Sequence, residues 1–177
     1  MSTAASSTAG AGPTRPAPAV IAVEPPRQPE VLRLLDASTA HARSLYAPEH
    51  SFLLDVGKLE RPEVRFYVAR DAAGAAVGTA ALMGGGRTDD GAPRGELKRM
   101  FVDPEARGLG VAGALLARIE ADARAEGLAE IVLETGDLHH AAQALYVKHG
   151  FRPIPQFGQY LGQPHSCCFG KRLDPAS

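Results

Sequence analysis

The segment from Met100 to Ala112 constrains the fold of this chain more than any other part of the sequence. Apolar residues typical of a strand end at Asp103-Pro104, which marks a turn, and apolar residues at helical spacing begin at Val111. Glycines occupy alternate positions between them, at Gly108 and Gly110. The first amides of a helix lack internal partners and lie at its positive end, and glycine lets an anion approach them closely. The sequence therefore predicts a strand, a phosphate-binding loop and a helix.

The same glycines allow a second interpretation, because residues 108–113 read GxGxxG. The dinucleotide fingerprint requires this motif directly after a strand of a repeated βαβ array, with an acidic residue about 20 positions later. Glu130 and Glu134 are available as that acid, but five residues separate the strand from Gly108 and too little chain follows for the rest of a doubly wound sheet. Binding of a nicotinamide dinucleotide is therefore the weaker alternative.

Periodicity along the chain predicts the order β, α, α, β, β, β, α, β, α, β, β, which gives an α/β (α+β) fold with a mixed sheet and helices packed on it. The predicted elements are strand Val20–Val23, a helix from Pro29 to Leu45, a short helical piece from Ser51, strands Val64–Ala69, Val77–Met83 and Glu96–Val102, helix Gly110–Glu126, strand Ile131–Glu134, helix His139–His149, and strands Phe151–Ile154 and Cys167–Leu173. Residues 20–177 are expected to form one domain. Residues 1–19 are rich in Ser, Thr, Ala, Gly and Pro, which predicts a disordered tail.

Composition excludes several classes of function. Lys and Arg together number 19 and Asp and Glu number 20, so the chain lacks the basic surplus expected of a protein that binds nucleic acid or an anionic membrane. It contains neither an apolar run of about 20 residues nor a secretory signal at Met1. The adjacent Cys167 and Cys168 match no zinc or redox spacing and are expected to be reduced packing residues, which indicates a cytoplasmic protein. The oligomeric state stays open, a homodimer included.

Two motifs carry a family resemblance. Arg107, Gly110 and Ala112 fit the phosphate-loop pattern Arg/Gln-x-x-Gly-x-Gly/Ala. The segment Ala142–Phe151 reads AQALYVKHGF and fits the pattern A-x-x-L-Y-x-x-x-G-F on the following helix. Together the two motifs resemble the GNAT superfamily of N-acetyltransferases. Both motifs occur in the family's order and at its separation, and the likeness extends over residues 20 to 173.

This resemblance implies a sheet that splays between the parallel strands Glu96–Val102 and Ile131–Glu134, with the pantetheine arm of acetyl-CoA in the gap and its pyrophosphate on the glycine loop. The residues expected to bind acetyl-CoA are Met100, Phe101, Val102, Arg107, Gly108, Leu109, Gly110, Val111 and Ala112. No metal is implied. An asparagine that is frequent at the start of the last helix is replaced here by His139, which leaves a cofactor contact at that position open.

The resemblance also implies two catalytic residues. Tyr146 matches a tyrosine that protonates the departing thiolate, and Glu96, six residues before the end of its strand, matches a glutamate that removes the amine proton, commonly through water. Read without the resemblance, Tyr146 is a half-buried core aromatic and Glu96 an exposed strand residue. Lys98 and Arg99 are expected to form a solvated edge. His139-His140 has no third ligand that would indicate a metal site.

The acceptor predicted for this activity is a primary amine of a small metabolite. A protein lysine or N-terminal amine is the alternative within the same enzyme class, and a non-catalytic acyl-CoA-binding module is the alternative outside it.

Overall fold

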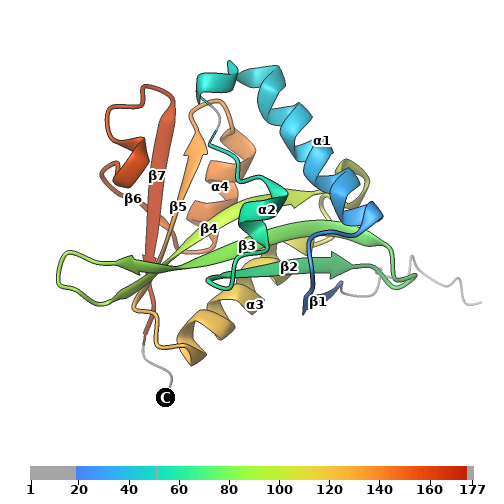
Figure 1. Ribbon diagram of the computed structural model, residues 1–177, viewed down its shortest axis with the longest axis horizontal. Coiled ribbons are helices and arrows are strands. Elements are labelled where there is room, and N and C mark those ends of the chain that lie inside the picture. Colours follow the sequence, from blue (N-terminus) through green and yellow to red (C-terminus); the bar gives the residue numbers. More distant parts are fainter. Residues whose placement is uncertain (1–18, 51, 175–177) are drawn as a thin grey trace, which may run out of the picture.

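The computed structural model describes residues 19–50 and 52–174, and the predicted tail lies outside the described residues except for Ala19. One seven-stranded sheet runs through the molecule in the order β1-β2-β3-β4-β5-β7-β6 (Figure 1). The strands are β1 (Val20–Val23), β2 (Val64–Arg70), β3 (Ala76–Arg87), β4 (Pro93–Val102), β5 (Glu130–Gly136), β6 (Arg152–Pro153) and β7 (Ser166–Arg172). Only β4 and β5 pair in parallel, and the other neighbours are antiparallel. This is the mixed sheet that the sequence predicts.

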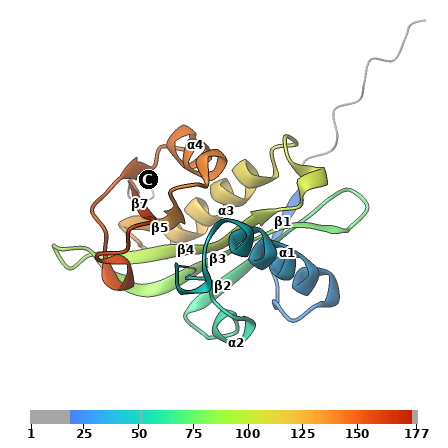
Figure 2. The same ribbon diagram turned by 90° about the horizontal axis from the view of Figure 1, so that it is seen from above.

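Helices cover both faces of the sheet (Figure 2). The helices are α1 (Pro29–Leu45), α2 (Val56–Leu59), α3 (Val111–Ala125) and α4 (His140–Lys148). Alternation along β2 divides the core, because Phe66 and Val68 pack with α1 and α2 on one face whereas Tyr67 and Ala69 pack with α3 and α4 on the other. None of the helices within residues 19–50 and 52–174 is long and apolar enough to cross a bilayer.

Two predicted elements differ from the structure. The short helical piece, predicted from Ser51 onward, begins at Val56, because the Asp55 side chain caps it by accepting a hydrogen bond from the Lys58 amide (2.9 Å). Ser51 itself lies outside the described residues. Strand β3 continues through the glycines predicted to connect it to β4, and Gly86 pairs with Arg94. Cross-strand pairing there outweighs the poor strand propensity of glycine.

The predicted splay lies between β4 and β5. Their pairing runs from Arg94 opposite Glu130 to Leu97 opposite Leu133 and then stops, although both strands continue. Strand β4 is bulged at this point, where Arg99 has a φ of 53° and its carbonyl accepts a hydrogen bond from the Thr79 hydroxyl (3.2 Å). We call the gap beyond Leu97 and Leu133 the wedge.

Candidate active site

The loop that joins β4 to α3 has the geometry of an anion-binding site. Gly108 and Gly110 have φ values of 78° and 84°, a region that favours glycine, and Gly110 is the N-cap of α3. The hydrogen bonds of α3 begin with the Ala114 amide donating to the Gly110 carbonyl (3.0 Å), so the preceding amides face outward. A Cβ built on either glycine would meet nothing within 4 Å. The residues present therefore fit the pyrophosphate of acetyl-CoA. We call residues Arg107–Ala112 the glycine loop.

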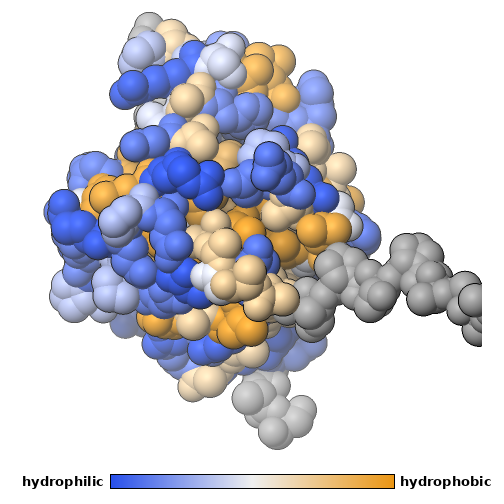
Figure 3. Space-filling view, turned by 90° about the vertical axis from the view of Figure 1, so that its right-hand side faces the viewer, coloured by the Kyte–Doolittle hydropathy of each residue, from blue (hydrophilic) through white to orange (hydrophobic). Residues whose placement is uncertain are grey.

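The side chain of Arg107 lies back along β4 instead of over the loop. Its Nε donates to the Val102 carbonyl (3.3 Å), and its guanidinium lies 5.9 Å from the centre of the Phe101 ring. The arginine therefore lies where the predicted pantetheine-binding strand meets the glycine loop. Figure 3 shows that the face at this end of the molecule carries small groups of hydrophobic residues separated by hydrophilic ones.

The third glycine of the GxGxxG pattern has a different use. A Cβ on Gly113 would lie 3.1 Å from Cε1 of His149, so this glycine lets α3 pack closely against the end of α4. Gly113 thus serves helix packing. The sheet is mixed, and the doubly wound sheet of the dinucleotide interpretation is absent from the described residues.

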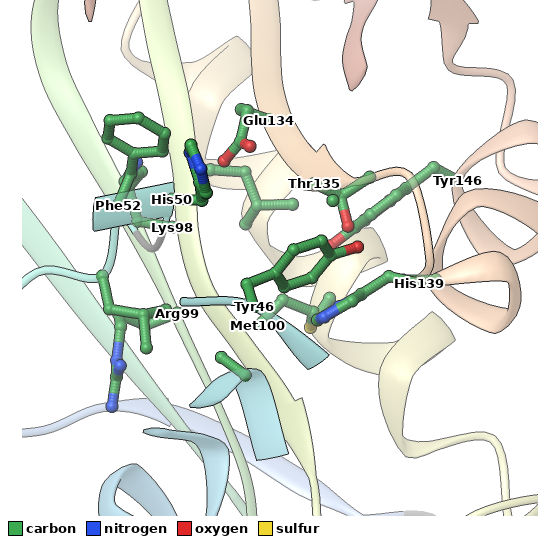
Figure 4. A pocket seen from close by; sticks show the side chains of 15 residues that line it. Tyr46, His50, Phe52, Lys98, Arg99, Met100, Glu134, Thr135, His139 and Tyr146 are labelled. Carbon is green, nitrogen blue, oxygen red and sulfur yellow. The ribbon is translucent and has the colours of Figure 1, made fainter. Parts of the chain in front are cut away.

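A cavity of about 120 Å³ opens in the wedge (Figure 4). Its walls come from the end of α1 and the segment after it, from β4, from the end of β5 and from α4. The lining residues are Ala42, Tyr46, His50, Phe52, Leu53, Leu97, Lys98, Arg99, Met100, Glu134, Thr135, Gly136, His139, Ala142 and Tyr146. Met100 and Tyr146, both predicted from the sequence, thus lie in one cavity, and the glycine loop follows the same strand.

Tyr146 lines the cavity from α4 and is otherwise packed in the core. Its ring is 5.8 Å from that of Phe151 and 6.4 Å from that of Phe169, and the residue is 6% exposed. Burial, together with the charge of Glu134, raises the pKa of the hydroxyl above its usual value. The hydroxyl therefore remains protonated at neutral pH, which suits a proton donor.

Glu96 lies beside the cavity and is not part of its wall. One carboxylate oxygen, Oε1, accepts hydrogen bonds from the Tyr160 hydroxyl (2.6 Å) and from the Lys98 ammonium (3.2 Å). Burial and then Glu96 raise the pKa of Tyr160 above its usual value, so the tyrosine is the donor of this hydrogen bond. The side chain of Glu96 keeps 15% exposure, which leaves it within reach of water.

The expected solvated edge at Lys98 and Arg99 was wrong, since each residue is 7% exposed. Lys98 bonds to the Tyr160 hydroxyl, and its ammonium lies 5.0 Å from the centre of the Tyr160 ring. Arg99 donates to the Leu35 carbonyl in α1 (2.7 Å). Both partners are more than 60 residues away in sequence, so strand periodicity alone could not indicate them.

Sequence reasoning also missed Glu134 as a site residue. This residue is the next same-face position after Val132, opposite Lys98 across the start of the wedge. Burial raises the pKa of its carboxyl, and the Ser166 hydroxyl donates to it (2.7 Å). Its place depends on the register of β4 against β5, which no local pattern gives.

A second group lies at the end of β5, beside the wedge, and we call it the Tyr46 cluster: Tyr46, Gly136, Asp137, Leu138 and His165. The Tyr46 hydroxyl accepts from the Leu138 amide (2.6 Å) and donates to Asp137 Oδ1 (3.1 Å), while Asp137 Oδ2 is 3.1 Å from His165 Nδ1. A Cβ on Gly136 would overlap the Tyr46 ring. Burial raises the pKa of Tyr46 to about 12. The cluster joins the end of α1 to the end of β5 and to the loop before β7.

His139, the residue that departs from the family pattern, also lines the cavity. Its ring centre is 5.5 Å from that of Tyr46, and its Nε2 is buried without a hydrogen-bond partner among the described residues. Burial lowers the pKa of the imidazole. No group of three or more His, Cys, Asp or Glu with metal-binding geometry occurs in the part of the chain that the structure describes.

Comparisons with known proteins find acetyltransferases that are similar in sequence and in fold. Residues 30–151 match the Acetyltransferase (GNAT) family. A protein of Azospirillum brasilense named IAA acetyltransferase is 41% identical over 153 residues, which cover 86% of this chain and 97% of that protein.

Solved structures agree with the sequence match. A Klebsiella pneumoniae protein assigned to the acyl-CoA N-acyltransferases is 31% identical with a TM-score of 0.73, covering 88% of this chain and 98% of its own. A GNAT family acetyltransferase from Elizabethkingia anophelis, solved with acetyl-CoA bound, is 17% identical with a TM-score of 0.64, covering 88% and 98%, and shares the fold.

Proposed function

This chain belongs to the GNAT acetyltransferase family, whose members are acetyl-CoA-dependent transferases, and on that premise we propose that it moves an acetyl group to the primary amine of a small metabolite. The observation that carries the proposal is the continuity of the site. The glycine loop directly follows β4, and β4 forms one wall of the cavity in the wedge. An anion site and an acceptor cavity are thus joined by one strand.

The glycine loop would hold the pyrophosphate through backbone amides, with the side chain of Arg107 beside it and Met100 to Val102 along the pantetheine arm. Acetyl-CoA supplies an acetyl group activated as a thioester. The contribution of this chain is to hold the acceptor nitrogen close to that group and to exclude bulk water, which supplies much of the acceleration in a two-substrate reaction.

Two proton transfers accompany acetyl transfer to an amine, and we assign each to one residue. Tyr146 holds a proton at its hydroxyl inside the cavity and gives it to the departing sulfur. Glu96 takes the proton of the amine through water, since its carboxylate lies beside the cavity and retains some exposure. Lys98 and Tyr160 orient that carboxylate by bonding to Oε1.

The size of the cavity favours a small acceptor over a protein. The cavity has a volume of about 120 Å³, Tyr46, Phe52 and Tyr146 are among its lining residues, and the Tyr46 cluster lies at its end. A protein lysine would need an open groove in which the flanking chain can lie.

Ligand binding tests the proposal directly. Acetyl-CoA should raise the melting temperature, because a ligand at a hundredfold excess over its Kd stabilises the folded state by about 2.7 kcal/mol, whereas NAD should have no effect. A panel of small primary amines, followed by release of free thiol, then tests turnover. Binding of NAD without binding of acetyl-CoA would contradict the proposal.

A further inference from the structure

The charges at the start of the wedge do not balance. Two carboxylates, Glu96 and Glu134, lie on the same face of neighbouring strands, and one ammonium, that of Lys98, lies with them. The ammonium bonds to Glu96 and to the Tyr160 hydroxyl. Glu134 accepts its hydrogen bond from a neutral hydroxyl, that of Ser166, and forms no ion pair among the residues the structure describes.

A buried carboxylate without a cation is costly, and it either takes up a proton or binds a cation. Arg99 does not fill this role, because its guanidinium points away from Glu134 toward α1 (Figure 4) and donates to the Leu35 carbonyl. His139, on the opposite wall, has its pKa lowered by burial and is neutral at physiological pH. The Lys98 ammonium faces Glu134 but makes its hydrogen bonds to Glu96 and Tyr160, so the cavity presents one carboxylate to which no cation of its own side chains is hydrogen-bonded.

We propose that Glu134 binds the ammonium group of the acceptor, and that the acceptor is therefore a cationic alkylamine instead of a neutral or anionic compound. The inference rests on the proposed function, which places the pantetheine arm in the wedge, so that the acceptor nitrogen must approach the acetyl group there. Phe52 and Tyr46 add aromatic faces to the same cavity, which favour a cation and apolar carbon next to it. Glu134 then selects and positions the amine. Glu96 lies on β4 opposite Val132, two residues before Glu134, and takes the proton of that amine.

The test uses the full chain without acetyl-CoA and three probes of similar size that differ in charge: 2-phenylethylamine, 2-phenylethanol and 3-phenylpropionate. Titrations followed by NMR should give the wild type an affinity for the amine on the order of tenfold or more above that for the alcohol, as expected for a charge-assisted hydrogen bond, and the weakest affinity for the carboxylate. Glu134→Gln should bring the amine to within about twofold of the alcohol. Glu130→Gln is the matched control on the same strand, at its far end beside Arg172, and should keep the preference.

A measurement on the wild type covers the case in which Glu134→Gln does not fold. Amine affinity should fall as the pH drops through the raised pKa of Glu134, whereas alcohol affinity should stay constant. The titratable groups that face Glu134 are Lys98 and Glu96 on β4, Cys167 and Cys168 on β7, Tyr146 on α4 and Tyr160 before β7. The cysteines and tyrosines among them have raised pKa values and stay protonated over this range. Glu96→Gln, which removes the other carboxylate, should keep the fall in amine affinity but shift it to lower pH, because the charge of Glu96 contributes to the raised pKa of Glu134.

Each outcome is decisive. Failure of the wild type to bind the amine, or equal amine affinity in the wild type and Glu134→Gln, overturns the role of Glu134. If acetyl transfer to amines still occurs in that case, the proposed function stands without it. Absence of both acetyl-CoA binding and transfer overturns the proposed function instead.

Discussion

The glycine loop and the wedge are built in different ways. The glycine loop is local, since its turn, its two positive-φ glycines and its helix start lie within residues 103–114 and act through backbone amides. The wedge is assembled from side chains of α1 and the segment after it, β4, β5 and α4, and one of these residues, Lys98, contacts a residue 62 positions away. The loop depends on chain conformation, whereas the wedge depends on register between distant segments.

Because of this difference, the glycine loop and the wedge should tolerate different substitutions. A backbone site loses function when a side chain enters it or when the φ of a glycine is forbidden, and it is little affected by removal of a neighbouring side chain. A side-chain site loses function when a single hydroxyl or carboxylate is removed, even though the fold remains. The predictions below test this contrast.

The largest effect is expected from Tyr146→Phe, which removes one hydroxyl from the wedge and keeps the ring packed against Phe151 and Phe169. If that hydroxyl protonates the leaving sulfur, kcat should fall on the order of 10²–10⁴-fold while acetyl-CoA affinity changes little. Steady-state kinetics and calorimetric titration measure the two quantities. Full turnover by the variant would remove the proton-donor assignment.

Glu96→Gln should cost about 10²-fold in kcat/KM at low pH, and the loss should shrink as pH rises. More of the acceptor amine is already neutral at high pH, so it needs no base. A pH–rate profile of the variant against the wild type checks this. A loss that is equal at every pH would make Glu96 a positioning group that holds Lys98 and Tyr160.

For the glycine loop, Gly110→Val should weaken acetyl-CoA binding on the order of tenfold, because a branched residue is strained at a φ of 84° and its side chain fills the open space. Arg107→Ala should weaken it less, since the guanidinium lies against Val102 and Phe101. Dephospho-CoA should still bind to the wild type. Equal affinities of wild type and Gly110→Val would mean that the phosphates bind elsewhere.

The contrast also explains how much could be predicted from the sequence. The order of strands and helices and the splay between β4 and β5 follow from periodicity, turn chemistry and family resemblance, and the structure confirms them. Tyr146 could be singled out as a site residue because it belongs to a contiguous motif, and it lines the cavity; its role as proton donor stays a prediction.

The missed features depend on pairing between distant segments. Lys98 and Arg99 looked exposed because a strand pattern reveals neither the bulge at Arg99 nor the distant partners of the two side chains, Tyr160 and the Leu35 carbonyl. Glu134 could not be recognised as a site residue from the sequence, because its position beside Lys98 depends on the register of β5 against β4. Tyr46 follows the last residue of a helix, and nothing near it indicates Asp137, 91 positions later.

The smallest effect is expected from Tyr46→Phe, which removes the two hydrogen bonds of the Tyr46 hydroxyl and leaves the ring over Gly136. Each bond contributes about 1 kcal/mol net, so the melting temperature should fall by a few degrees. Because Tyr46 lines the cavity, the KM for the amine should also rise, by about threefold, a change of less than 1 kcal/mol.

A matched control separates that local role from general stability. Tyr67 donates to Asp122 (3.0 Å), much as Tyr46 donates to Asp137 (3.1 Å), but its ring packs in the core against α3, on the other face of the sheet from α1. Tyr67→Phe removes one hydrogen bond instead of two, so it should lower the melting temperature by about half as much and leave the KM for the amine unchanged. If both variants raise KM equally, the effect of Tyr46 is one of stability alone, and the wedge does not depend on the cluster beside it.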